Sequence, residues 1–193
     1  MPAMLPDPWE SVRTRHGFPA DEVRSTLQKE IRRGNLDNAI RLAFEMLSTS
    51  PEMEELLWKR LLVISVEDIG MAEPLAPILI NTLYQQHHRI ELEEGERELL
   101  AIHAVRFLCE CGKDRSSDEM LLWLRMLTNQ NELRPQIKDY GVDMHTLRGR
   151  KMGRDIVHFM HEGTKVHPEL RHRNRVYRRR VLQRLTRSVD HSD

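Results

Sequence analysis

The sequence contains few of the residues on which secreted proteins and β-sheet proteins rely. Its 193 residues include 2 cysteines and 5% aromatic side chains, whereas disulfide frameworks are rich in cysteine and sheets favour aromatic and β-branched residues. Cys109 and Cys111 lie two positions apart in a helical pattern and therefore point in different directions. We expect packing thiols that form neither a disulfide nor a zinc site.

Long apolar runs are also missing. The apolar stretches at 61–66 and 75–80 are much shorter than the roughly 20 residues that span a bilayer. The N-terminal residues carry prolines and acids where a secretory signal needs a basic start and an apolar run. We therefore expect a cytoplasmic protein that does not associate with a membrane.

The common catalytic signatures are absent. The Gly112-Lys113 pair is followed by Asp114 and lacks the earlier glycine of a phosphate-binding loop. The sequence has no G-x-S-x-G elbow, no H-E-x-x-H zinc helix and no G-x-G-x-x-G turn. These absences predict a protein that is not an enzyme and that needs no cofactor.

What the sequence does contain is helical periodicity. Apolar residues recur at spacings of three and four, and this pattern predicts helices over 21–33, 36–47, 52–68, 74–86, 96–111 and 116–127. Leu57, Leu61 and Ile64 share one face of the third helix. In the sixth helix, the residues expected to face the core are Met120, Trp123, Leu124 and Leu127.

The expected helix ends carry suitable residues. Glycine favours the left-handed conformation that ends helices, and the glycines expected in this role are Gly34, Gly70 and Gly112. Polar side chains cap helix starts, and the candidates are Asn35 or Asp37 for the second helix and Ser116 or Ser117 for the sixth. Pro74 suits the first position of the fourth helix.

These features predict an all-α fold, either a multi-helix bundle or stacked helical hairpins. Residues 1–20, rich in proline, form an extended N-terminal arm, and residues 21–128 form the helical core. Residues 129–193 form an irregular basic C-terminal extension that glycines interrupt. Within it we expect short segments over 135–140 and 155–161 and a last basic helix from Pro168 toward Arg187.

Charge is segregated along the chain, although 30 basic and 30 acidic residues cancel. From Glu52 to Asp118 there are 14 acidic and 7 basic residues, and from Arg148 to Arg187 there are 13 basic and 3 acidic residues. Guanidinium groups match phosphate oxygens, and the candidate nucleic-acid contacts are Arg148, Arg150, Lys151, Arg154, Arg171, Arg173, Arg175, Arg178, Arg179, Arg180, Arg184 and Arg187. Alternatively, the basic helix docks on the acidic middle of this chain or of a second copy.

Gly149 and Gly153 interrupt the first basic run. Glycine lets main-chain N–H groups approach an anion, so this run is a second candidate anion site. It is equally consistent with a solvated loop.

The adjacent acids Glu67 and Asp68 end the third helix. Neighbouring residues on a helix diverge by about 100°, which does not suit an acid and base acting together. Asp68 continues the stripe of Leu61 and Ile64, so we expect it to turn inward and accept hydrogen bonds from the start of the next helix. Ligand binding is the alternative, and the predicted structural motif is Glu67, Asp68, Gly70 and Pro74.

Histidines provide the remaining candidates for chemistry. His158 and His161 are three residues apart on one helical face, near Glu162 and His167, and could share a metal. Surface histidines beside arginines explain the same pattern, and we predict no metal site. His103 lies among apolar residues, where we expect a hydrogen-bonded core histidine.

Three segments resemble a known family. They are Leu27-Gln-Lys-Glu-Ile-Arg-Arg-Gly34, Asp37-Asn-Ala-Ile40 and Leu57-Trp-Lys-Arg-Leu-Leu-Val-Ile-Ser-Val-Glu-Asp-Ile-Gly-Met-Ala-Glu-Pro74. They are similar to the C-terminal helical region of RarA/MgsA-type AAA+ ATPases over roughly 22–123, and the stretch from Glu67 to Pro74 is the most specific part. The resemblance implies a fold like the clamp-loader collar domain, here as a standalone relative without the ATPase motor.

The family acts at stalled replication forks, and its C-terminal helices assemble the oligomer and help to contact DNA. The resemblance therefore implies a homo-oligomer that binds DNA, an AAA+ ATPase or another replication or repair protein. One alternative is a protein adaptor that does not bind DNA. The other is a metal-dependent hydrolase or nuclease at His158, His161 and His167.

Overall fold

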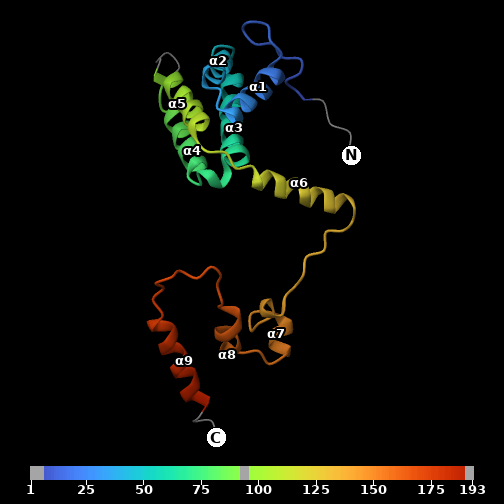
Figure 1. Ribbon diagram of the computed structural model, residues 1–193, viewed down its shortest axis with the longest axis vertical. Helices are drawn as coiled ribbons and strands as arrows, with labels where there is room; N and C mark the ends of the chain where they lie inside the picture. Colours follow the sequence, from blue (N-terminus) through green and yellow to red (C-terminus); the bar gives the residue numbers. More distant parts are fainter. Residues whose placement is uncertain (1–6, 92–95, 190–193) are drawn as a thin grey trace. The chain divides into compact units, whose positions relative to one another are not determined.

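The computed structural model describes residues 7–91 and 96–189, and all its regular elements in these ranges are helical (Figure 1). The all-α prediction is therefore confirmed. The chain divides into two compact units, residues 1–132 and residues 133–193. The α-helices of the N-terminal unit are α1 (Ala20–Arg33), α2 (Leu36–Leu47), α3 (Pro51–Ile64), α4 (Ala76–His87), α5 (Glu96–Glu110) and α6 (Ser116–Asn129).

The core of the N-terminal unit lies among α1 to α5, with α2 packed against both α1 and α5. The predicted stripe of α3 is buried: Leu57, Leu61 and Ile64 expose none of their surface. Burial of each such side chain contributes about 1.5–3 kcal/mol. This packing, rather than helix propensity, holds the bundle together.

Several helix ends follow the predictions. Gly34 ends α1 in the left-handed conformation, with φ 72°. Asn35 occupies the position before α2, as predicted, although its side chain makes no capping hydrogen bond. The prediction for Gly112 is wrong, because Gly112 does not adopt the left-handed conformation. The end of α5 is instead closed by Lys113, whose Nζ donates to the carbonyls of Leu108 at 3.0 Å and Cys109 at 3.1 Å.

The predicted third helix changes character before it ends. α3 stops at Ile64 and continues as a π-helical turn, η1 (Ser65–Ile69). Gly70 follows η1, as the sequence predicted, with φ 52°. A short 3₁₀ turn, η2 (Gly70–Ala72), then leads toward α4.

One predicted helix start and one predicted helix cap are wrong. α4 begins at Ala76, and the proline in its first turn is Pro77, so Pro74 lies outside the helix. α6 begins at Ser116, whose N–H donates to the carboxylate of Asp114 at 2.9 Å. The residue before the helix is Arg115, and no serine hydroxyl caps the helix.

The N-terminal segment 7–19 folds onto the bundle, whereas the sequence predicted an extended arm. Trp9 and Val12 are half-buried against the core. Asp7 accepts a hydrogen bond from Arg24 on α1. The rest of the predicted arm, residues 1–6, lies outside the described residues.

The largest departure concerns α6, which runs away from the bundle (Figure 1). No residue of this helix is buried, and its main packing partner is η1. Trp123 is 59% exposed, and Met120 and Leu124 are also exposed, so the predicted inward face is wrong. Helical periodicity shows which side chains share a face but not whether a partner covers that face.

The C-terminal unit has four short elements and one longer helix in the described residues. They are η3 (Asp139–Gly141), α7 (Leu147–Lys151), α8 (Ile156–His158), η4 (Phe159–Gly163) and α9 (Val176–Val189). The last helix begins at Val176 and not at Pro168, because the side chain of Asn174 accepts the Val176 N–H at 2.9 Å. Across the described ranges, no helix is long and apolar enough to cross a membrane.

Candidate functional site

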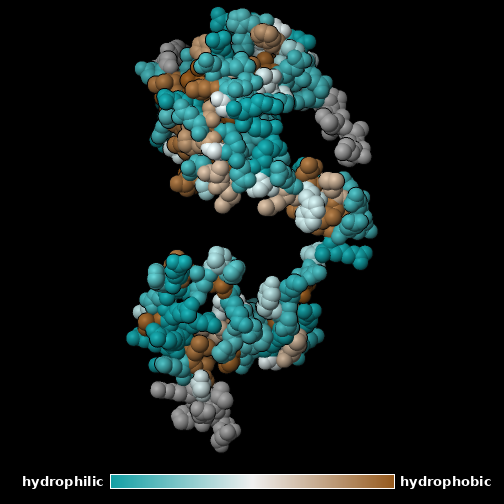
Figure 2. Space-filling model, viewed as in Figure 1, coloured by the Kyte–Doolittle hydropathy of each residue, from teal (hydrophilic) through white to brown (hydrophobic). Residues whose placement is uncertain are grey.

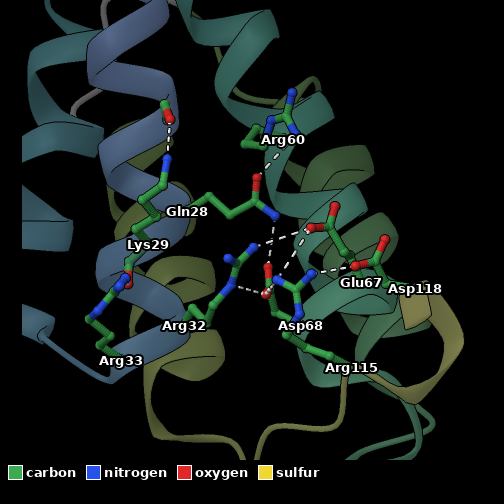
Figure 3. Close-up of polar contacts among 10 residues, drawn as sticks. Gln28, Lys29, Arg32, Arg33, Arg60, Glu67, Asp68, Arg115 and Asp118 are labelled. Carbon is green, nitrogen blue, oxygen red and sulfur yellow. Dashed lines mark hydrogen bonds and ion pairs between the residues drawn. The ribbon is translucent and has the colours of Figure 1, made fainter. Parts of the chain in front are cut away.

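A buried carboxylate joins three parts of the N-terminal unit (Figure 3). Asp68 on η1 exposes none of its surface. Its Oδ2 accepts from Gln28 Nε2 on α1 at 2.8 Å. Its Oδ1 accepts from Arg32 Nε on α1 and from Arg115 Nη1 at 3.2 Å. The predicted bonds to the start of the next helix are replaced by these side-chain donors.

Other charges surround this carboxylate. Glu67 accepts from Arg32 Nη2 at 3.2 Å and lies 3.7 Å from Arg115 Nη1. Arg115 also pairs with Asp118 in the first turn of α6. The Asp68 carbonyl accepts the N–H of Asp114 at 2.9 Å. We call Gln28, Arg32, Glu67, Asp68 and Arg115 the Asp68 cluster; it ties α1, η1 and the start of α6 together, and its central carboxylate has no exposed surface to offer a ligand.

Glycine is required beside this cluster. A β-carbon on residue 70 would lie 2.3 Å from the Asp114 carbonyl oxygen. The positive φ of Gly70 adds a second cost for any other residue. The close approach of η1 to the segment before α6 therefore depends on the absence of a side chain.

Some of the predicted nucleic-acid contacts also form hydrogen bonds and ion pairs within the C-terminal unit. Arg154 donates to the carbonyls of Asp139 at 2.8 Å and of Val142, and pairs with the Asp139 carboxylate at 2.6 Å. This hydrogen bond lowers the pKa of Asp139. Arg178 donates to Thr164 Oγ1 at 2.5 Å and to the Met160 carbonyl.

Arg173 and Arg175 share one carboxylate, that of Glu169. Arg180 stacks over the ring of Tyr177 at 5.5 Å, and Arg150 donates to the Met144 carbonyl at 3.3 Å. Arg184 also has an interaction partner. The side chain of Arg187 lies outside the described residues.

A third set of these basic residues faces solvent. Four side chains are exposed and form no hydrogen bond or ion pair with the part of the chain that the structure describes: Arg148, Lys151, Arg171 and Arg179. Such side chains are available to contact phosphates.

The two glycines of the first basic run do not offer free N–H groups. Gly149 donates to Thr146 Oγ1 at 3.0 Å, and Gly153 donates to the Arg150 carbonyl at 3.0 Å. Gly149 is buried, and a β-carbon there would lie 1.8 Å from the Asp143 carbonyl oxygen. This glycine permits close packing, so the predicted main-chain anion site is wrong.

The histidines predicted as metal candidates do not form a metal-binding group. In residues 7–91 and 96–189, no three side chains of His, Cys, Asp or Glu are arranged to hold a metal, and this includes His158, His161 and His167. His103 is exposed, so the predicted core histidine is wrong. Cys109 and Cys111 are free thiols, and burial raises the pKa of Cys109 to about 11.

The buried histidine is His87, at the end of α4. Its Nδ1 lies 3.1 Å from the Arg97 carbonyl oxygen, and Arg97 Nε lies 3.0 Å from its Nε2. His87 Nε2 also lies 2.9 Å from Glu54 Oε1, and Arg97 pairs with the same carboxylate at 3.2 Å. Burial lowers the pKa of His87. The spacing of Ile80, Leu83 and His87 on one helical face was the sequence signal for this position.

The exposed apolar residues of α6 form a candidate interface, which Figure 2 shows among polar surroundings. We define the α6 surface as the exposed side chains Met120, Leu121, Leu122, Trp123, Leu124 and Met126. Leu121 also lines a groove of about 390 Å³ with Leu62, Val63 and Val66, which are exposed on α3 and η1. The apolar surface therefore continues from α6 onto the bundle.

Comparison with known proteins places the helical bundle in a family. The family described as MgsA AAA+ ATPase C terminal matches residues 34–134, which is more than half of the chain. The match spans α2 to α6 and includes the Asp68–Gly70 turn and the α6 surface. No curated protein matches the chain.

Proposed function

Because the chain belongs to the family of MgsA AAA+ ATPase C-terminal domains, we propose that it is a non-catalytic module that self-associates and binds DNA. Self-association uses the α6 surface, and the observation that supports it is a 14-residue helix with no buried residue. Isolated helices of this length are marginal in water. A second copy would cover the apolar side chains on the face of Leu122, because neighbouring helix residues diverge by about 100°, and would stabilise the helix.

Charge on α6 suits a pair of identical helices. Glu119 and Arg125 are exposed and have no partner in the described part of the chain. They lie three residues before and three residues after Leu122. In an antiparallel pair centred on Leu122, Glu119 of each copy therefore approaches Arg125 of the other. A twofold interface of this kind repeats each contact and closes at a dimer.

Sedimentation velocity of the full chain tests this interface. We expect Leu122→Glu to shift the protein toward monomer, because it places charge at the centre of the apolar contact. Met71→Glu is the matched control, since Met71 is an exposed apolar residue outside α6. A monomeric wild-type protein at high concentration would contradict the proposal.

A charge exchange tests the antiparallel arrangement separately. Glu119→Arg alone and Arg125→Glu alone each place like charges together and weaken association. The double exchange restores opposite charges and should recover most of the wild-type affinity. Additive losses in the double variant would rule out this pairing of the two residues.

DNA binding is proposed for the C-terminal unit, and the exposed side chains of Arg148, Lys151, Arg171 and Arg179 support it. Contacts of this kind go to the phosphate backbone, so affinity falls with salt and depends little on base sequence. Basic residues outnumber acidic ones from Arg148 to Arg187, so this part of the sequence suits a polyanion.

Fluorescence anisotropy with labelled single-stranded, duplex and forked DNA at several salt concentrations tests this proposal. Arg171→Ala combined with Arg179→Ala should weaken binding to every sequence alike and make the salt dependence shallower. Arg89→Ala is the control, because Arg89 is an exposed residue of the N-terminal unit. Absence of binding at low salt would favour an adaptor that contacts only proteins.

A further inference from the structure

A small basic pocket lies wholly within the C-terminal unit. It has a volume of about 250 Å³, and its charged lining consists of Lys165, Glu169, Arg173, Arg175 and Arg178. This volume is below the usual range for sites that enclose a whole small molecule. The pocket therefore suits one compact group rather than a complete nucleotide.

The positive charge of this pocket is only partly balanced. Arg173 Nη1 lies 2.6 Å from Glu169 Oε1, and Arg175 pairs with Oε2 of the same carboxylate. One negative charge thus faces two guanidinium groups. The pKa of Glu169 is lowered, first by its hydrogen bond with Arg173, so the carboxylate stays ionised near neutral pH.

Arg178 adds a second unbalanced charge. Its guanidinium donates to Thr164 Oγ1 at 2.5 Å and to the Met160 carbonyl, and both acceptors are neutral. Lys165 is compensated outside the pocket, where it pairs with Glu162 at 2.7 Å. The pocket and its ion-pair partners therefore carry a net charge of about two positive units, taking each ionised side chain at its full charge.

We infer that this pocket binds a phosphomonoester, of the kind that ends a nucleic-acid strand. A phosphomonoester carries close to two negative charges near neutral pH, whereas a phosphodiester within a strand carries one. Its oxygens accept the paired N–H groups of guanidinium forks. The charge of the terminal group thus matches the unbalanced charge of the pocket.

The surroundings favour a nucleic-acid strand over free phosphate. Arg171 lies between the pocket residues Glu169 and Arg173 in the sequence, and Arg179 follows Arg178; both are exposed and available for backbone phosphates. Tyr177 is 71% exposed and adjoins Arg178 in the chain. An exposed aromatic ring beside arginines is suited to stacking of an unpaired base. This inference rests on the proposed binding of DNA and adds a preference for strand ends.

The test compares two short single-stranded DNAs that differ only in a 5′ phosphate or a 5′ hydroxyl. Anisotropy is measured with the full chain at a salt concentration that weakens backbone contacts. We expect about tenfold tighter binding of the phosphorylated strand, and inorganic phosphate should compete away this excess. Equal affinities would overturn the pocket assignment and leave the proposed DNA binding intact. Equal binding of a phosphoserine peptide would overturn the assignment to a strand end.

Two variants with opposite effects sharpen the test, and the readout is the ratio of the two affinities. Arg175→Ala should reduce the preference for the phosphorylated strand, because it removes a hydrogen-bond donor to the phosphate. The Arg175 side chain is 60% exposed, so its removal should disturb the fold little. Glu169→Gln should increase the preference, because it removes the competing carboxylate. Arg89→Ala should leave the ratio unchanged. A loss of preference in Glu169→Gln would overturn the inference.

Inorganic phosphate alone provides a readout that does not depend on DNA binding. Titrated into the isotopically labelled full chain, it should shift the amide resonances of residues 164–178 in NMR spectra. If DNA binding fails but these shifts occur, the pocket assignment stands and the proposed DNA interface falls. Absence of shifts in this segment would overturn the pocket itself.

Discussion

The carbonyl oxygen of Asp114 lies 2.3 Å from the position that a β-carbon on Gly70 would occupy. Gly70→Ala must therefore displace either η1 or the segment before α6. We expect about 1–2 kcal/mol from the positive φ and about 1–3 kcal/mol more from the clash. Gly17→Ala isolates the first cost, because Gly17 also has positive φ but a β-carbon there would meet no atom within 4 Å. Urea unfolding measures the stability lost in each variant. Equal losses in the two variants would show that the contact with the Asp114 carbonyl adds no cost.

Asp68→Asn should destabilise the N-terminal unit strongly. The substitution leaves Arg32 and Arg115 facing a neutral buried amide in place of a carboxylate. Removal of one partner from a buried ionic cluster costs about 3–5 kcal/mol. Asp118→Asn is the control, since Asp118 is partly exposed and its pair with Arg115 should contribute at most about 1 kcal/mol. Chemical unfolding measures the free energy of unfolding of both variants. Similar losses in the two variants would show that the Asp68 cluster contributes no more stability than an exposed ion pair.

His87 predicts a loss of stability in mild acid. Its pKa is lowered by burial from a usual value of 6.5, so the unfolded chain binds more protons than the folded chain below about pH 6.5. The stabilising contribution is complete above that pH and declines as the pH falls toward the folded pKa. Glu54, Arg97 and His88 also face this ring. These three residues are the same in the wild-type protein and in the His87→Gln variant used below.

Thermal unfolding of the full chain from about pH 7.5 to about pH 5.5 measures this dependence. His87→Gln should flatten the decline in Tm relative to wild type, whereas His103→Gln, at an exposed histidine, should leave the decline unchanged. The same slope in wild type and His87→Gln would assign the pH dependence to other groups.

Arg154 and Arg148 should separate folding from binding. Arg154→Ala removes the donor for the Asp139 and Val142 carbonyls, so we expect a loss of about 1–3 kcal/mol in the C-terminal unit. Arg148→Ala should change stability by no more than about 0.5 kcal/mol, because the side chain is exposed. Hydrogen exchange of residues 139–151 measures the stability of both variants, and DNA anisotropy should show weaker binding for Arg148→Ala. Equal stability of both variants would contradict the division of the basic residues.

Local sequence patterns predicted the features that depend on residues close together in the chain, namely buried helix faces and helix ends. The stripe of Leu57, Leu61 and Ile64 indicated a buried face, and Gly34 indicated a helix end, because both depend on spacing along one helix. The partners of Asp68 are 36, 40 and 47 residues away, and periodicity contains no information on such contacts.

The wrong prediction for α6 has the same origin. A helical stripe looks identical whether it packs inside its own unit or awaits another surface, so α6 was expected to face the core. A basic run likewise does not show which arginines satisfy nearby carbonyls, as Arg154 and Arg178 do. Both distinctions require the folded arrangement of the chain.

The central claim is that the α6 surface is an interface between copies of this chain. Amide hydrogen exchange of α6, measured at increasing protein concentration, tests it most directly. We predict that exchange at residues 116–129 slows as concentration rises, while exchange in α3 stays constant, and that Leu122→Glu abolishes the effect. Exchange in α6 that is independent of concentration, in a protein that remains monomeric, would contradict the claim.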